Sequence, residues 1–114
     1  MNQIARALTL IHNEYQRPID VQELARTAHM SGSTFHEAFK AVTSLTPVQY
    51  VKEIRLNRAR QIMVWEGASA KRAAAQVGYA SASQFSREFK RRFGRPPGQE
   101  RAWAIESGEV AASA

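Results

Sequence analysis

The feature that most limits how this chain can fold is an internal repeat with a period of 50 residues. Without a gap, residues 24–40 (LARTAHMSGSTFHEAFK) align with residues 74–90 (AAQVGYASASQFSREFK). The identical pairs are Ala25 and Ala75, Ser31 and Ser81, Ser33 and Ser83, Phe35 and Phe85, Phe39 and Phe89, Lys40 and Lys90, Pro47 and Pro97, and Gln49 and Gln99. Identities in one register indicate the duplication of a small structural unit. The fold must therefore build a similar unit twice.

Each copy has a helical pattern. Apolar residues recur at intervals of three and four, and no stretch alternates as a strand does. Cap signals divide the chain into helices expected near residues 2–15, 20–27, 31–43, 47–66, 69–77, 81–93 and 97–103. The strongest start signal combines a capping hydroxyl at Thr46, a proline at Pro47 and a glutamine at Gln49. The sequence predicts an all-α protein of about seven helices.

Within each copy, a short helix, a tight turn at Ala28 or Gly78 and a second helix form a helix-turn-helix pattern. We therefore expect two helix-turn-helix subdomains joined by one long helix. The expected boundaries are residues 1–45 for the first subdomain, 46–66 for the connecting helix, 67–103 for the second subdomain and 104–114 for a flexible tail. Ile54 and Ile62 of the long helix are expected to be buried between or beneath the two subdomains, and Trp65 and Trp103 are expected to pack in the core or at helix ends.

The charge lies in one half of the chain. Residues 1–50 are neutral overall, so the second half carries the whole net charge of +6. A one-sided positive field is typical of proteins that bind an anion such as nucleic acid, although a solvated charged face would look similar. A helix of about 19 residues spans roughly 28 Å, close to the roughly 34 Å between successive major grooves of DNA.

A helical wheel separates two faces on the second helix of each copy. Phe85 and Phe89 mark the buried face of one helix, and Phe35, Phe39 and Val42 mark that of the other. Candidates for reading bases are Ser33, His36, Glu37, Ser83, Ser86 and Arg87. Candidates for contacting phosphates are Lys40, Lys71, Lys90, Arg91 and Arg95.

Other classes of function find little support. The chain has no cysteine and only three scattered histidines, which predicts no metal site and no cofactor. His36 and Glu37 are neighbours whose side chains diverge by 100° on a helix, so no catalytic pair is expected and the protein is predicted not to be an enzyme. No stretch could cross a bilayer or serve as a signal peptide, which indicates a cytoplasmic protein. The alternative is a basic amphipathic protein that binds a membrane surface or a protein partner.

The stretch VGYASASQFSREFKRRFG (residues 77–94), followed by two prolines, resembles the signature of the AraC/XylS family of bacterial transcription regulators. IRLNRARQIM (residues 54–63) resembles the helix that joins that family's two subdomains. The resemblance covers nearly all of residues 2–103. It implies a seven-helix unit that binds double-stranded promoter DNA and contacts RNA polymerase, with Arg87 at a frequent base contact and with Ser83 and Ser86 at positions that touch bases or phosphate.

The sequence departs from the family's pattern in three places. Glu37 stands where a basic residue is common, Ala28 where the turn often has glycine, and Pro96 with Glu100 where a Ser or Thr cap and a Tyr are common. The family usually joins this unit to an effector-binding or dimerisation domain, which would lie outside this chain, yet some members consist of the DNA-binding unit alone.

Overall fold

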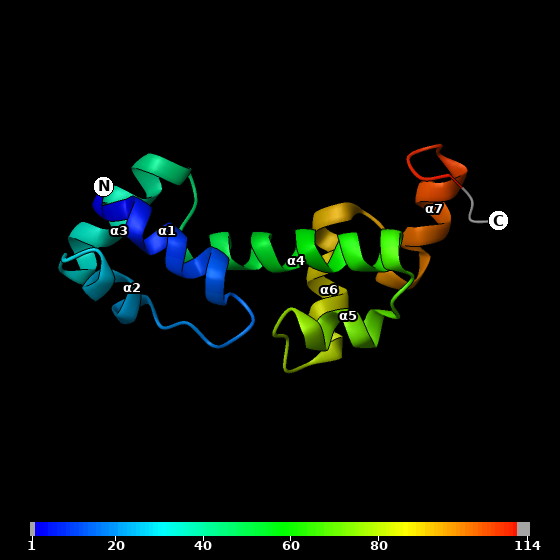
Figure 1. The fold of residues 1–114 in the computed structure, drawn as a ribbon, viewed down its shortest axis with the longest axis horizontal. Helices are drawn as coiled ribbons and strands as arrows, with labels where there is room; N and C mark the ends of the chain where they lie inside the picture. The colour runs from blue at the N-terminus through cyan, green and yellow to red at the C-terminus, as the bar shows by residue number, and fades with distance from the viewer. Residues whose placement is uncertain (1, 112–114) are drawn as a thin grey trace. The chain divides into compact units, whose positions relative to one another are not determined.

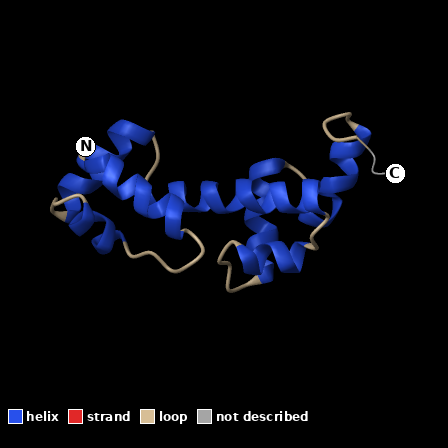
Figure 2. Cartoon of the chain, viewed as in Figure 1, coloured by secondary structure: helices blue, strands red, loops and turns tan. Residues whose placement is uncertain are grey.

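The computed structural model describes residues 2–111, and every regular element within them is a helix (Figures 1 and 2). The α-helices are α1 (Gln3–Glu14), α2 (Val21–Thr27), α3 (Gly32–Thr43), α4 (Pro47–Glu66), α5 (Ala70–Gln76), α6 (Ala82–Phe93) and α7 (Glu100–Glu106). One 3₁₀ turn, Pro97–Gln99, precedes α7. The predicted all-α fold is confirmed. None of the described helices is both long and apolar enough to cross a membrane.

Helices α1 to α6 begin where the sequence places a side chain that accepts a backbone hydrogen bond, whereas α7 follows the 3₁₀ turn without such a cap. Asn2, Asp20, Ser31, Ser69 and Ser81 each accept from an amide in the first turn that follows. At the start of α4 two bonds are reciprocal: the Thr46 hydroxyl accepts from the Gln49 amide at 3.2 Å, and the Gln49 side chain accepts from the Thr46 amide at 3.0 Å. These bonds satisfy amides that a helix leaves without a partner, so they fix where each helix starts.

The chain divides into two compact units between Ile54 and Arg55, inside α4. In unit 1, which ends at Ile54, α1, α2 and α3 pack around one core. Its buried members are Ile4, Ala7, Ile11, Leu24, Ala25, Ala28, Phe35 and Phe39. Ile54 is only partly buried against this cluster, so the expectation that it is an interior residue was too strong.

In unit 2, which begins at Arg55, the second half of α4 takes the place that α1 has in unit 1. Leu56, Ala59 and Met63 are buried at the same spacing as Ile4, Ala7 and Ile11. The guanidinium of Arg55 lies 6.0 Å from the Tyr79 ring centre, and that of Arg60 lies 5.7 Å from the Phe93 ring centre. Figure 1 accordingly shows this half of α4 beside α5 and α6. Ile62 is buried, as predicted.

The internal repeat is visible in the burial of single residues. From residue 31 to 49, each position has the same burial class as the position 50 residues later. Before the turn, however, the copies match at an interval of 49: Ala25 and Ala74 are both buried, while Ala75 is exposed. The gapless alignment was therefore wrong in α2 and α5. Unit 2 has one extra residue between its turn and α6.

The turn itself lies one residue later in unit 1 than expected. Ala28 has φ −85° and is fully buried, and the positive φ of 57° falls on His29. In unit 2 the positive φ of 99° falls on Gly78, as predicted. In both turns the following residue, Met30 or Tyr79, donates its amide to a carbonyl in the preceding helix at 2.9 Å. The two turns are thus built alike, with histidine in one and glycine in the other at the strained position.

Val42 is more exposed than the sequence predicts, and the two tryptophans are not core residues. Val42 is 56% exposed because it lies in the last turn of α3, beyond the core of unit 1. Trp65 is 61% exposed near the end of α4, and Trp103 is 40% exposed on α7. Helix α7 also continues to Glu106, three residues past its expected end. The predicted tail lies partly outside the description, because residues 112–114 are not among the described residues.

Candidate nucleic-acid interface

Helix α6 has an exposed basic face and a buried face formed by two phenylalanines. Phe85 and Phe89 are at most 1% exposed, and their ring centres lie 5.6 Å apart. All five candidate residues on this helix are exposed: Ser83, Ser86, Arg87, Lys90 and Arg91. Because Phe85 and Phe89 fill the interior, the polar face of α6 is available to a ligand. A Ser81 cap, which accepts from the Gln84 amide at 3.1 Å, and the left-handed Gly94 fix the two ends of the helix.

Helix α3 also buries two phenylalanines, but its exposed face differs from that of α6 in charge. Phe35 and Phe39 are fully buried with ring centres 5.4 Å apart. The candidates on this helix are all exposed: Ser33, His36, Glu37 and Lys40. Their charges nearly cancel, since Glu37 opposes Lys40. The two helices therefore present similar shapes with different electrostatic fields.

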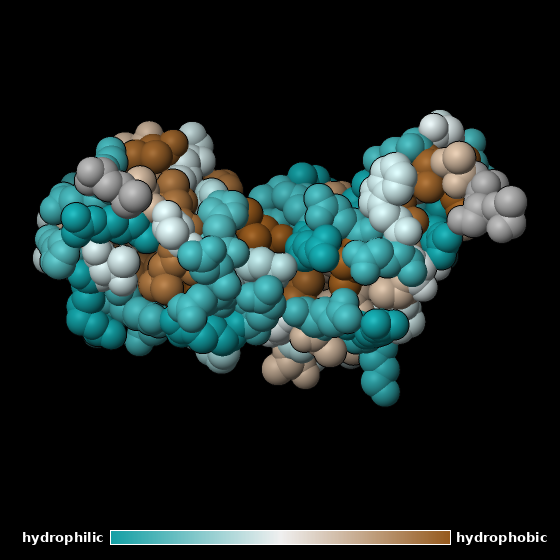
Figure 3. Space-filling view, in the orientation of Figure 1, coloured by the Kyte–Doolittle hydropathy of each residue, from teal (hydrophilic) through white to brown (hydrophobic). Residues whose placement is uncertain are grey.

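Lys71 is exposed in the first turn of α5, beside the exposed Arg72. Because α5 packs against α6, unit 2 gathers basic side chains from two helices. On the face shown in Figure 3, hydrophilic residues cover most of both units. No group of three or more metal-ligating side chains occurs among residues 2–111.

A small polar cluster ties α6 to its turn. The Tyr79 hydroxyl donates to Glu88 Oε1 at 2.7 Å, and Gln84 Nε2 donates to Glu88 Oε2 at 2.9 Å. The Tyr79 ring also packs against Phe85, with ring centres 5.3 Å apart. Burial and the bond to Glu88 raise the pKa of Tyr79 well above its ordinary value, so the hydroxyl stays a donor at neutral pH. Sequence reasoning missed this cluster, although Gln84 and Glu88 stand four residues apart on one face.

Arg95, a candidate for phosphate contact, is engaged within unit 2. Its Nε donates to Glu100 Oε1 at 2.7 Å, and its guanidinium carbon lies 3.6 Å from the Trp103 ring centre. The Arg95 side chain is 28% exposed. The Arg95 guanidinium is therefore engaged with Glu100 and Trp103 of its own unit.

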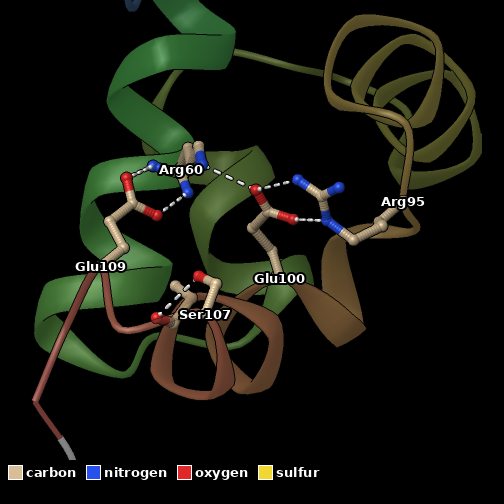
Figure 4. Close-up of polar contacts among 6 residues, drawn as sticks. Arg60, Arg95, Glu100, Ser107 and Glu109 are labelled. Carbon is tan, nitrogen blue, oxygen red and sulfur yellow. Dashed lines mark hydrogen bonds and ion pairs between the residues drawn. The ribbon is translucent and has the colours of Figure 1, made fainter.

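Glu100 is the buried centre of this network, as Figure 4 shows. Its side chain is fully buried, and it accepts from Arg60 Nε at 2.6 Å in addition to Arg95. Arg60 also pairs with Glu109. Burial alone would raise the pKa of Glu100, but the bonds from Arg95 and Arg60 outweigh burial and hold this pKa below its usual range. The buried carboxylate of Glu100 thus has its charge compensated by two arginines.

Known transcription regulators are similar to this chain over most of its length. A family profile described as a helix-turn-helix domain matches residues 24–102. The regulator AlkR of Acinetobacter baylyi is 34% identical over 83% of this chain and 31% of its own length. A putative AraC-like transcription regulator of Streptomyces lividans is 38% identical over 86% of this chain and 32% of its own length. The chain therefore spans about a third of the length of these curated relatives.

Solved structures share the fold. The DNA-binding domain of AdpA, solved in complex with a target DNA, superposes with a TM-score of 0.88 at 23% identity, covering 97% of this chain and 100% of that one. A transcriptional regulator from Chromobacterium violaceum, described as having an AraC-type DNA-binding domain, gives a TM-score of 0.80 at 27% identity, over 88% of this chain and 89% of that one.

Proposed function

The chain belongs to the AraC-type family of helix-turn-helix transcription regulators, and on that premise we propose that it binds double-stranded promoter DNA with α3 and α6 in successive major grooves. The members of this family are DNA-binding regulators and not enzymes. One observation carries the proposal: α6 exposes Arg87, Lys90 and Arg91 on a helix whose other face is anchored by two buried phenylalanines. An exposed basic helix in a helix-turn-helix unit has the shape and charge that a major groove accepts.

We assign two roles to the outer residues. Arg87 can donate two bonds from its planar guanidinium to O6 and N7 of one guanine, which makes it the principal base reader. The remaining proposed base readers are Ser83, Ser86, Ser33, His36 and Glu37. Lys90, Arg91, Lys71 and Lys40 are proposed phosphate contacts. Arg95 contributes positive charge nearby, but its bonds to Glu100 make it the weakest candidate of this set.

The subdomain division also becomes part of this proposal. We assign residues 1–45 and 67–103 to the two DNA-reading subdomains and residues 46–66 to the helix that connects them. The connecting helix α4 has 20 residues and rises about 30 Å. We further propose a cytoplasmic location, because bacterial DNA lies in that compartment.

Selection from a pool of randomised duplex DNA tests the proposal. The parent should enrich an asymmetric site of about two helical turns. Arg87→Ala should weaken the preferred site by about 1 to 3 kcal/mol and leave scrambled DNA nearly unaffected. Arg91→Ala is the matched control on the same helix and should weaken both DNAs alike. Equal binding of the parent to heparin, anionic vesicles and any DNA would contradict the proposal and favour a membrane-surface or partner-binding protein.

Glu37→Ala tests the first half-site separately. A carboxylate can only accept a hydrogen bond, for example from a cytosine amino group, and it repels phosphate. We expect total affinity to be unchanged or raised and base preference to relax in the half-site of α3 alone. A large loss of overall affinity would show instead that Glu37 has a structural role.

Activities of a whole regulator remain separate proposals, because the chain spans about a third of its relatives. We propose that the DNA-bound chain contacts RNA polymerase and that a full-length protein joins this unit to an effector-binding or dimerisation domain. A gel-shift assay with purified polymerase on the selected site tests the first point: a cooperative ternary complex supports it, and independent binding contradicts it.

A further inference from the structure

The direction of one exposed amide on α6 is set by the carboxylate of Glu88. Gln84 Nε2 donates to Glu88 Oε2 at 2.9 Å, and the Tyr79 hydroxyl donates to Glu88 Oε1 at 2.7 Å. Each oxygen of the carboxylate therefore has a donor. Because Tyr79 lies in the turn and Gln84 in the first turn of α6, Glu88 connects the two segments.

Chemistry allows only one orientation of the Gln84 amide in this cluster. An ionised carboxylate accepts hydrogen bonds and donates none, so the amide nitrogen must face Glu88. The reverse orientation would place two oxygens against each other. Arg55 and Glu88 also attract each other electrostatically. The carbonyl oxygen Oε1 of Gln84 consequently points away from Glu88.

The position of Gln84 places it among the proposed DNA contacts. It is exposed, and it precedes Arg87 by three residues and Arg91 by seven, so the three side chains lie along one side of α6. Glutamine recognises adenine in the major groove by accepting from N6 and donating to N7. One hydrogen of Nε2 is held by Glu88, which leaves Oε1 and the second hydrogen for a base.

We propose that Gln84 is a specificity-determining residue of α6, and that Glu88 and Tyr79 are positioning residues that make it select a base with an amino group at its major-groove edge, adenine before cytosine. The inference rests on the proposed function, since it requires α6 to lie in a major groove. Guanine and thymine present carbonyl oxygens where adenine and cytosine present amino groups, so the fixed Oε1 disfavours them.

Unit 1 offers a built-in contrast, because its corresponding residues are Met30, Thr34 and Ala38. None of these has a carboxylate, and the Thr34 hydroxyl instead lies 3.0 Å from that of Ser31. The preference fixed by an oriented amide is thus expected only in the half-site bound by α6.

Selection from a randomised duplex pool with the 114-residue chain tests the inference. The parent should prefer adenine over guanine by about fivefold or more at one position beside the base assigned to Arg87. Gln84→Met, which keeps the length of the side chain, should abolish the preference at that position alone. Glu88→Gln should bring the adenine-to-guanine ratio close to one, because the amides of residues 84 and 88 can then reverse together. Tyr79→Phe should give a smaller change in the same direction.

Each other outcome is decisive. Retention of the parent's preference by Gln84→Met or by Glu88→Gln overturns the inference. A loss of preference at every position in Glu88→Gln, together with a lower melting temperature, overturns it too, because Glu88 would then only support the fold. If Arg87→Ala loses its guanine while Gln84→Met changes nothing, the inference fails and the proposed function stands. If the parent selects no sequence, both fail.

Discussion

Units 1 and 2 differ in chemistry and in burial at the corresponding positions 50 and 100, because Tyr50 is only partly buried whereas Glu100 is fully buried. At residues 50 and 100, unit 1 has the aromatic ring of Tyr50, packed edge-on to Phe39 with ring centres 5.5 Å apart, whereas unit 2 has the buried carboxylate of Glu100 between two arginines. The Tyr50 hydroxyl lies 2.8 Å from His12 Nε2. The corresponding positions of the two units therefore tolerate either an aromatic ring or an ion-paired carboxylate, provided that each buried polar atom has a hydrogen-bond partner.

The comparison predicts its largest effect at this position. Glu100→Ala should lower the free energy of unfolding of unit 2 by about 3 to 5 kcal/mol, because Arg60 and Arg95 lose the charge that compensates them. Tyr50→Phe in unit 1 removes one hydroxyl and should cost about 1 kcal/mol. Hydrogen exchange of amides in each unit measures both. Equal losses of unfolding free energy in the two variants would contradict the proposed difference between Glu100 and Tyr50.

Acidification should also lower the stability of unit 2 more than that of unit 1. The pKa of Glu100 is lowered in the folded protein, so its contribution to stability is complete above the ordinary glutamate pKa of about 4.3 and is lost as the pH falls below that value. Glu23 of unit 1 also has a lowered pKa through Arg17, but this pair is partly exposed and solvent screens it. Unit 2 should therefore open first on acid titration followed by NMR. Glu100→Gln should remove most of this difference.

The two isoleucines of α4 test the packing of each unit. Ile62→Ala should cost about 2 to 4 kcal/mol in unit 2, where this side chain is 3% exposed. Ile54→Ala should cost less, about 1 to 2 kcal/mol in unit 1, because Ile54 is only partly buried. Thermal melting of both variants checks the order, and a larger loss for Ile54→Ala would reverse our assignment of the core.

The identical pair Lys40 and Lys90 tests the charge difference between the two helices. The parent should bind DNA with a log-log salt slope of about −4 to −5, and Lys90→Gln should reduce its magnitude by about 1. Lys40→Gln should change the slope less, since Glu37 already repels phosphate beside it. Titrations at several salt concentrations measure both slopes. Equal changes would show that the field of α3 resembles that of α6.

The smallest expected effect concerns the ends of α3 and α6. Both end in a left-handed residue, Ser44 with φ 66° and Gly94 with φ 85°. Gly94→Ala should cost about 1 kcal/mol through its backbone alone, since a Cβ there would meet no atom within 4 Å. Ser44→Gly should stabilise unit 1 by up to about 1 kcal/mol. Melting temperatures of both variants check the opposite signs.

The sequence predicted the helices well because their signals are local. Caps at Asp20, Ser31, Ser69 and Ser81 lie at the helix starts, and the phenylalanine pairs identify the buried faces of α3 and α6. The same local reasoning placed all of the proposed DNA contacts except Arg95 on exposed positions. Their roles stay predictions, since no contact with DNA tests them.

Features that depend on packing between segments were missed. Unit 2 has one more residue than unit 1 between its turn and the helix that follows. The gapless alignment ignores this residue and therefore pairs Ala25 with Ala75, so it hides the difference between the turns. The partners of Glu100 lie 40 residues before it and 5 residues before it, so no periodic pattern reveals the buried network. The bond from the Gln84 side chain to Glu88 was likewise not expected from the sequence.

The Glu100 network also constrains how this domain can change by mutation. Replacement of Glu100 by tyrosine would leave Arg60 and Arg95 facing an aromatic ring, and replacement of either arginine first would leave the buried carboxylate with one partner. Each single step lowers stability, so an aromatic ring at position 100 is reached only through a less stable intermediate or by simultaneous substitutions. Exchanging the segments around residues 50 and 100 between the two units would lower stability for the same reason. Epistasis among Arg60, Arg95 and Glu100 thus ties the residue at position 100 to its two partners.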